Sequence, residues 1–241
     1  MLSPHHTFQT ILFSFLFCGA ALIAVKAAVR EPTAVPTAAS GTPSAVVMID
    51  PGHGGEDGGA SDGGVLEKGL NLAVAADLAD YFDLFGIPAA MTRTEDTMLY
   101  DAYGDLADYK GHKKSYDLRN RLRMTEESGA RLLVSVHMNK FPQPSTRGMQ
   151  VYYSPNTPES ASAASVLRSY GQTYLSPDNR RETKKATDAI YLLKRAKMPA
   201  VLVECGFLSN PDERALLVTP AYQEKVAAVL FAGIAEYLAQ S

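Results

Sequence analysis

The sequence contains no tryptophan, only two cysteines and no surplus of basic residues. Cys18 lies in an apolar N-terminal run, so no internal disulfide is expected in the rest of the chain, and Cys205 is predicted to be packed and inert. The formal net charge is −3 and the pI about 6.0, whereas nucleic-acid-binding domains are usually strongly basic. We therefore expect no nucleic-acid partner.

Nucleotide-binding loops are also lacking, although the chain is rich in glycine after its first apolar strand. No G-x-G-x-x-G occurs between Gly52 and Gly64, and Lys68 lacks the G-K-[ST] context of a phosphate-binding loop. The glycines therefore need another explanation than a phosphate cradle.

The longest apolar run, Ile11 to Val25, is short for a membrane-spanning helix. Its 15 residues fit the hydrophobic core of a secretory signal better than a transmembrane helix, which needs about 20. No Lys or Arg precedes the run, which leaves an uncleaved anchor with N-terminal membrane association as the alternative. We predict a signal peptide or anchor over 1–28, a flexible linker over 29–44 and one domain over 45–241, exported beyond the cytoplasmic membrane.

Short apolar runs alternate with helical periodicity through the predicted domain. Leu70, Val74 and Leu78, for example, recur with the spacing of one helix face. Strands are expected at 45–49, 87–92, 132–136, 149–153, 190–193 and 200–203, helices at 67–85, 115–129, 159–174 and 222–238, and a surface loop at 94–114. This alternation predicts an α/β fold, a single domain with a twisted, largely parallel sheet and helices on both faces.

Three chemically active side chains follow the ends of three predicted strands. His53, His137 and Glu204 each come directly after or close to a buried run, and Glu67 begins the first long helix. Because parallel strands end at one edge of a sheet, these residues are expected to meet there. Two imidazoles and a carboxylate form the open ligand set of catalytic zinc, with water in the fourth position, and Glu204 could then move the proton of that water.

Each of these residues also has a structural interpretation. A histidine at a strand end is commonly a hydrogen-bonded structural residue, Glu67 could only favour the helix N-terminus, and Glu204 could only cap a turn. Asn71 could support Glu67 or be solvated, and Asn139 could orient a substrate or form a turn. The basic clusters at 110–123 and 180–185 could meet the carboxylates of an anionic polymer, but they are interpreted as solvated surfaces.

Four sequence blocks, however, resemble one enzyme family when they are taken together. These are VMIDPGHGGEDGGA, EKGLNLAVA, LLVSVHMN and PAVLVECGFLSNPDE, and the chain is similar over 45–240 to the zinc-dependent N-acetylmuramoyl-L-alanine amidases of bacterial cell walls. The resemblance implies Zn²⁺ held by His53, Glu67 and His137, with Glu204 as the catalytic carboxylate. It also implies hydrolysis of the amide between N-acetylmuramic acid and L-alanine in peptidoglycan.

A narrower resemblance lies in KKSYDLRNRL and AIYLLKRAKMPAVLVECGFLSN, which look like the germination-specific, spore-cortex branch. That branch implies a role in muramic lactam formation, with an activating lipoprotein or a deacetylase as partner, in the cell wall or spore envelope. The alternatives are a vegetative wall hydrolase, a zinc carboxypeptidase acting on the stem peptide, and a non-catalytic peptidoglycan-binding module with a structural metal.

Overall fold

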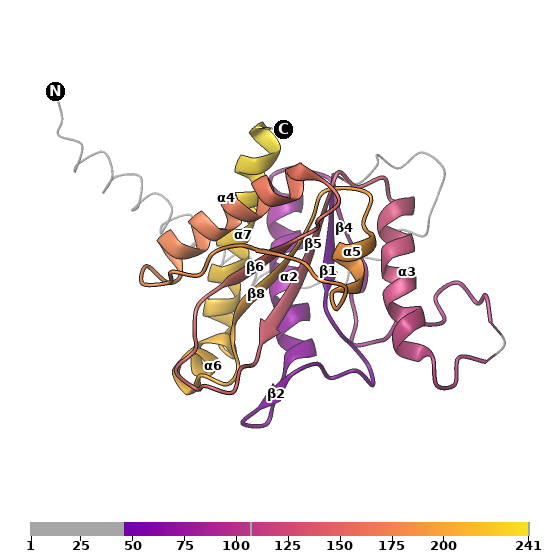
Figure 1. Ribbon diagram of the computed structural model, residues 1–241, viewed down its shortest axis with the longest axis horizontal. Coiled ribbons are helices and arrows are strands. Elements are labelled where there is room, and N and C mark those ends of the chain that lie inside the picture. Colours follow the sequence, from indigo (N-terminus) through magenta and orange to yellow (C-terminus); the bar gives the residue numbers. More distant parts are fainter. Residues whose placement is uncertain (1–45, 107, 241) are drawn as a thin grey trace. The chain divides into compact units, whose positions relative to one another are not determined.

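The computed structural model describes residues 46–106 and 108–240, so the predicted signal or anchor and the predicted linker lie outside the described residues. A six-stranded sheet runs through this part in the order β4-β1-β5-β8-β6-β7 (Figure 1). Its strands are β1 Val47–Pro51, β4 Ala89–Met91, β5 Leu132–Asn139, β6 Gln150–Tyr153, β7 Lys184–Lys185 and β8 Ala200–Phe207. β4, β1, β5 and β8 are parallel, whereas β6 is antiparallel to β8 and β7 is parallel to β6. The predicted largely parallel sheet is confirmed.

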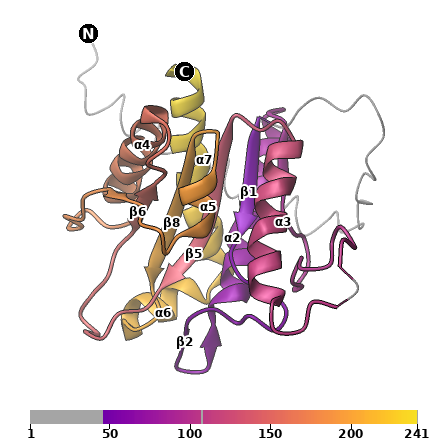
Figure 2. The same cartoon turned by 45° about the vertical axis from the view of Figure 1, so that its right-hand side comes forward.

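Helices cover both faces of this sheet, as the sequence predicted (Figures 1 and 2). The helices are α2 Glu67–Leu84, α3 Lys113–Glu127, α4 Pro158–Tyr174, α5 Tyr191–Arg195, α6 Pro211–Leu217 and α7 Pro220–Gln240. The larger core joins α2, α4 and α7 to one face, and a smaller core joins α3 and α5 to the other. A small hairpin, β2 Ser61–Asp62 with β3 Val65–Leu66, leads directly into α2.

The helical spacing seen in the sequence accounts for the packing of α2. Leu70, Val74, Leu78 and Phe82 recur on one face of the helix and are all buried in the larger core. The helix ends before Gly86, whose φ of 66° lies in the left-handed region that glycine adopts easily. This packing fixes the direction of α2 and therefore the place of its first residue at the sheet edge.

The strand predicted at 190–193 is wrong, because this segment forms the short helix α5. The buried side chains of Leu192 and Leu193 pack in the smaller core against one face of the sheet, so this segment does not add a strand to the sheet. A short apolar run fits a buried helical turn as well as a strand, so the pattern did not discriminate between them. Four further elements, β2, β3, β7 and α6, were absent from the predicted set.

Among the described residues, no helix is both long and apolar enough to cross a membrane.

Candidate metal centre

The four predicted site residues lie at the carboxyl-terminal edge of the parallel strands. His53 follows β1, His137 lies near the end of β5, Glu204 lies in β8, and Glu67 is the first residue of α2. His137 and Glu204 are direct neighbours across the β5–β8 pairing. The sheet therefore brings together residues that are widely separated in the sequence.

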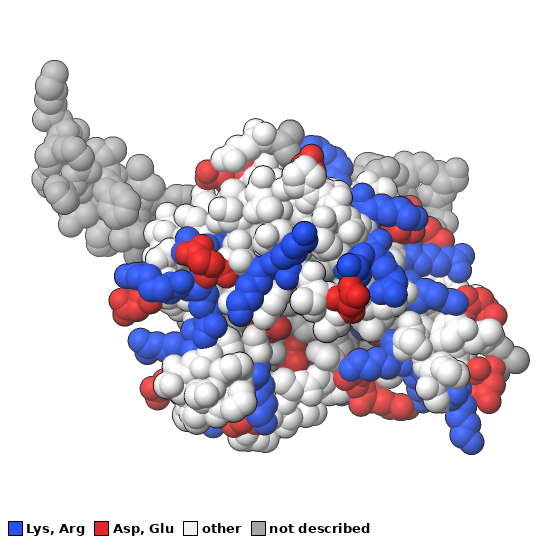
Figure 3. Space-filling model, in the orientation of Figure 1, with Lys and Arg blue, Asp and Glu red and all other residues white. Residues whose placement is uncertain are grey.

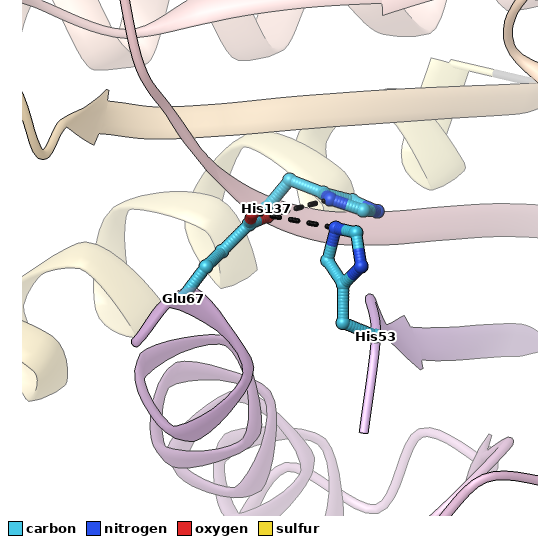
Figure 4. A group of neighbouring side chains, drawn as sticks. All are labelled: His53, Glu67 and His137. Carbon is cyan, nitrogen blue, oxygen red and sulfur yellow. Dashed lines mark hydrogen bonds and ion pairs between the residues drawn. The ribbon is translucent and has the colours of Figure 1, made fainter. Parts of the chain in front are cut away.

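The two histidines and Glu67 converge on one point (Figure 4). Their ligand atoms all lie within 4.8 Å of one another. Nδ1 of His137 is 2.8 Å from Oε1 of Glu67, and Nε2 of His53 is 3.3 Å from Oε2 of the same carboxylate. The two imidazole rings meet edge to face with centroids 5.0 Å apart.

Glu67 is buried, yet its carboxylate has several donors. The backbone N–H of Ala60 donates to Oε2 at 2.7 Å, while the N–H of Met138 and Nδ2 of Asn71 each donate to Oε1 at 3.1 Å. Burial alone would raise the pKa of Glu67, but its contacts with His137 and His53 hold that pKa well below its usual range. The carboxylate is therefore ionised and fixed in orientation.

The backbone of His53 has φ 62°, in the left-handed region that non-glycine residues rarely adopt. Two buried arginines hold the carbonyls around it. Arg93 donates to the carbonyls of Pro51 and Gly52, each at 3.0 Å, and Arg121 donates to those of Pro51 and His53, each at 2.7 Å. These bonds satisfy carbonyls that the end of β1 leaves unpaired and hold the strained turn in place.

Arg121 corrects the interpretation of the 110–123 cluster as a solvated surface. Its side chain is buried and forms ion pairs with Asp50 and Asp117, each at 2.8 Å. Other members of the cluster do lie at the surface, where Lys113 pairs with Glu56 of the glycine loop. The cluster therefore contacts the glycine loop through the buried side chain of Arg121 and through Lys113 at the surface.

Asp57 is a functional candidate that the sequence reasoning missed. Its Oδ2 lies 2.9 Å from Nδ1 of His53 and 3.1 Å from Nζ of Lys114. Burial alone would lower the pKa of His53, but Glu67 and Asp57 together raise it. Carboxylates commonly orient metal-binding histidines in this way, so the four-residue spacing from His53 was the available signal.

Two glycines leave room that any side chain would fill. A Cβ on Gly52 would lie 2.2 Å from the ring of His137, and a Cβ on Gly59 would lie 2.5 Å from Oε2 of Glu67 and 2.7 Å from the ring of His53. The glycine-rich loop is therefore required for close approach of the backbone to the three converging residues.

Glu204 lies beside this cluster without a hydrogen-bond partner. Its Oε2 is buried and unpaired, and burial, followed by the nearby charge of Glu67, raises the pKa of Glu204 to about 7 against the lowering effect of the two histidines. A bound dication would lower this pKa. A buried carboxylate with no hydrogen-bond partner among residues 46–106 and 108–240 is available to interact with a reacting group.

The donor set fits zinc. Two imidazole nitrogens and one ionised carboxylate oxygen converge from three different segments of the chain, the set of three protein ligands that catalytic zinc sites use. Residues 47–236 match the N-acetylmuramoyl-L-alanine amidase family. The chain belongs to this family of enzymes. The family assignment predicted from the four sequence blocks is therefore confirmed.

Relatives of this amidase are found over most of its length. The chain is 37% identical over 199 residues to the germination-specific N-acetylmuramoyl-L-alanine amidase of Bacillus subtilis, covering 81% of this chain and 80% of the relative. Among solved structures, it is similar to the CwlD amidase of Clostridioides difficile in complex with the GerS lipoprotein, with a TM-score of 0.75, 34% identity and coverage of 81% and 98%. It is also similar to AmiC2 of Nostoc punctiforme, with a TM-score of 0.69, 30% identity and coverage of 83% and 99%.

The remaining candidates have separate places in the amidase. Asn71 supports Glu67 and also donates to the carbonyl of Gly52 at 3.1 Å, whereas the side chain of Asn139, at the end of β5, accepts from the backbone N–H of Lys140. His112 is exposed and lies outside the cluster. Cys205 is buried in the larger core, and burial raises the pKa of its thiol, as expected for an inert cysteine.

Proposed function

We propose that this chain is a zinc-dependent amidase that hydrolyses the bond between N-acetylmuramic acid and L-alanine, with His53, Glu67 and His137 as ligands and Glu204 as the catalytic carboxylate. The observation that carries the proposal is the convergence of three ligand atoms within 4.8 Å beside a buried, unpaired carboxylate. Membership of the amidase family supports the bond that is cleaved.

The residues of this chain divide the reaction between them. Zinc, when bound, would polarise the amide carbonyl and lower the pKa of a water molecule. Glu204 accepts the proton of the attacking water and delivers it to the leaving amine of L-alanine. Glu67 stays fixed through the reaction because Asn71 and the backbone N–H groups of Ala60 and Met138 hold its carboxylate in orientation.

The substrate we propose is spore-cortex peptidoglycan, where removal of stem peptides would precede muramic lactam formation. The identity to a germination-specific amidase supports this choice over a vegetative cell wall. An activating lipoprotein is a plausible class of partner, since the similar CwlD amidase was solved in complex with the GerS lipoprotein. Action on peptidoglycan places the domain outside the cytoplasmic membrane, with residues 1–28 proposed as its signal or anchor and 29–44 as its linker.

The proposal is tested with the purified protein, peptidoglycan and mass spectrometry of the products. We expect stem peptides that begin with a free L-alanine amine, with cleavage abolished by a chelator and restored by zinc. Glu204→Gln should lose at least about a hundred-fold in rate while it retains one zinc per chain. Zinc-loaded protein that binds peptidoglycan without cleaving it would instead favour the binding-module alternative.

The zinc ligands are tested separately with matched histidine variants. His137→Ala should lose tight zinc binding, measured by competition with a chromogenic chelator, whereas His112→Ala, which changes an exposed histidine outside the cluster, should keep it. Equal zinc affinity in the two variants would refute the ligand assignment. Parallel digests of spore cortex and vegetative wall then distinguish the two proposed substrates.

A further inference from the structure

The sheet continues beyond β8, the strand that carries Glu204, into β6 and β7. In the antiparallel pairing of β6 with β8, Gln150 lies opposite Glu204 and Tyr152 opposite Leu202. Side chains alternate along a strand, and directly opposed residues share a face of the sheet. Glu204 and Tyr152 therefore lie on the same face, the one that carries α3 and α5.

β7 extends this face by one more strand. Lys184 is opposite Tyr152 in the β6–β7 pairing, and its Nζ lies 5.9 Å from the centroid of the Tyr152 ring, so the side chain lies over β6 on the face that also carries Glu204. Lys185 is the next residue, also exposed, and alternation turns it to the opposite face. The two lysines therefore differ mainly in the face of the sheet that they serve.

Arg181 adds a second cation to this surface. Its guanidinium stacks over Phe207 at 4.6 Å, and its Nε donates to the carbonyl of Arg147 at 3.3 Å. The pKa of Tyr152 is raised by burial and then by the charge of Glu204, against the lowering effect of Arg181. Among the described residues, neither Arg181 nor Lys184 forms an ion pair with a carboxylate.

Figure 3 shows this face of the molecule. Lys and Arg side chains gather over the region of β6 and the segment after α4, and acidic side chains are visible on the floor of a hollow below them. Arg181 and Lys184 each lie over an aromatic ring, and neither forms an ion pair with a described carboxylate. The two cations therefore form a surface suited to an anionic group.

The order of the strands places this surface on one side of the proposed ligands. The proposed ligands lie on the β1 and β5 side, and β6 and β7 lie beyond Glu204 on the other. On the proposed mechanism Glu204 delivers its proton to the leaving amine, and a stem peptide that leaves the site on the side away from the ligands would extend from Glu204 over β6 and β7. On the proposed amidase function, we infer that Arg181 and Lys184 form a subsite for a free carboxylate of the stem peptide.

The spacing indicates which part of the stem is recognised. Neighbouring strands are about 4.8 Å apart, so β7 lies about 10 Å from β8. An extended peptide advances about 3.3–3.6 Å per residue, which puts the recognised carboxylate on the second or third residue after the scissile amide. The subsite therefore distinguishes stems that carry a free carboxylate there from stems in which it is amidated.

The test compares two soluble muramoyl tripeptides, one with free carboxylates on its second and third residues and one with carboxamides at both positions. The zinc-loaded protein should show a kcat/KM about five-fold higher for the carboxylate, as expected for a partly exposed charge pair. Lys184→Gln should lose most of this preference and the double variant with Arg181→Gln should lose all of it. Lys185→Gln is the matched control and should keep it.

The outcomes separate this subsite from the amidase function itself. Cleavage of both peptides at equal kcat/KM by the unaltered protein, or equal effects of Lys184→Gln and Lys185→Gln, would overturn the subsite while leaving the amidase intact. Failure to cleave either peptide or intact peptidoglycan would refute the amidase function on which the subsite rests.

Discussion

Arg121 offers a direct test of how the glycine loop is held, through the substitution Arg121→Met. This change removes the partner of two buried carboxylates, Asp50 and Asp117, and the donors to the carbonyls of Pro51 and His53. Methionine fills much of the same volume, so the change is mainly one of charge and hydrogen bonding. Both the free energy of unfolding and the position of His53 are therefore expected to respond.

The expected loss is large because the ion pair is almost fully buried. The side chains of Arg121 and Asp50 are 2% and 1% exposed. Removing one partner of such a pair leaves an uncompensated buried charge and typically costs about 3–5 kcal/mol in the free energy of unfolding. Arg119→Met on the same helix breaks only a half-exposed pair with Asp105 and should cost less than about 1 kcal/mol.

The pH dependence of this loss has a definite sign. Burial alone would raise the pKa of Asp50, but Arg121, with hydrogen bonds from Ser135 and Thr92, holds it below its usual range. A lowered pKa contributes stability that is present above the pKa of the unfolded chain, about 3.9, and is lost as the pH falls. The cost of Arg121→Met should therefore be greatest near neutral pH and shrink below about pH 4.

Urea unfolding of the metal-free protein and both variants, at pH 7 and at about pH 3, measures these differences. A loss below about 1 kcal/mol for Arg121→Met at pH 7, or one that does not change with pH, would refute the buried-network argument. An equal loss of unfolding free energy in Arg121→Met and Arg119→Met would also refute it, since the buried and the surface ion pairs would then contribute equally to stability.

Three shorter predictions concern the surroundings of the proposed ligands. Asp57→Asn should weaken zinc binding about 10- to 100-fold in chelator competition, because a neutral amide orients His53 less strongly; unchanged affinity would contradict that role. Gly59→Ala should lower both zinc affinity and thermal stability, because its Cβ would overlap Glu67 and the φ of 68° disfavours alanine; a fully zinc-competent, equally stable variant would contradict it. Cys205 should react with a thiol reagent only after unfolding, so rapid labelling of the native protein would contradict its burial.

The strand ends were predictable because their signals are local. Continuous apolar runs precede His137 and Glu204, and parallel strands that end together bring such residues to one edge. The start of α2 was equally predictable, since the spacing of its buried leucines requires Glu67 to lie at its N-terminus. These features placed all four candidate residues in one region of the fold.

The supports of the site were not predictable, because their signals are not local. Arg121 meets Asp50 across 71 positions of sequence, and nothing in its basic neighbourhood marks it as buried. The reversal of β6 also leaves no trace in the apolar pattern of Gln150–Tyr153, since a strand reads the same in either direction. The helix at 191–195 was mistaken for a strand for a related reason: its buried face is too short to show a period.

The separation of the site along the chain has a consequence for when the enzyme can work. Ser135 and Asp50 pair across 85 positions of sequence, and Glu204 joins His137 only when β8 docks beside β5. Pairings between such distant segments close long loops and form slowly. A nascent or truncated chain that ends before β8 would carry the three proposed ligands but lack Glu204. On the proposed mechanism, hydrolysis therefore begins only when synthesis and folding of the domain are complete.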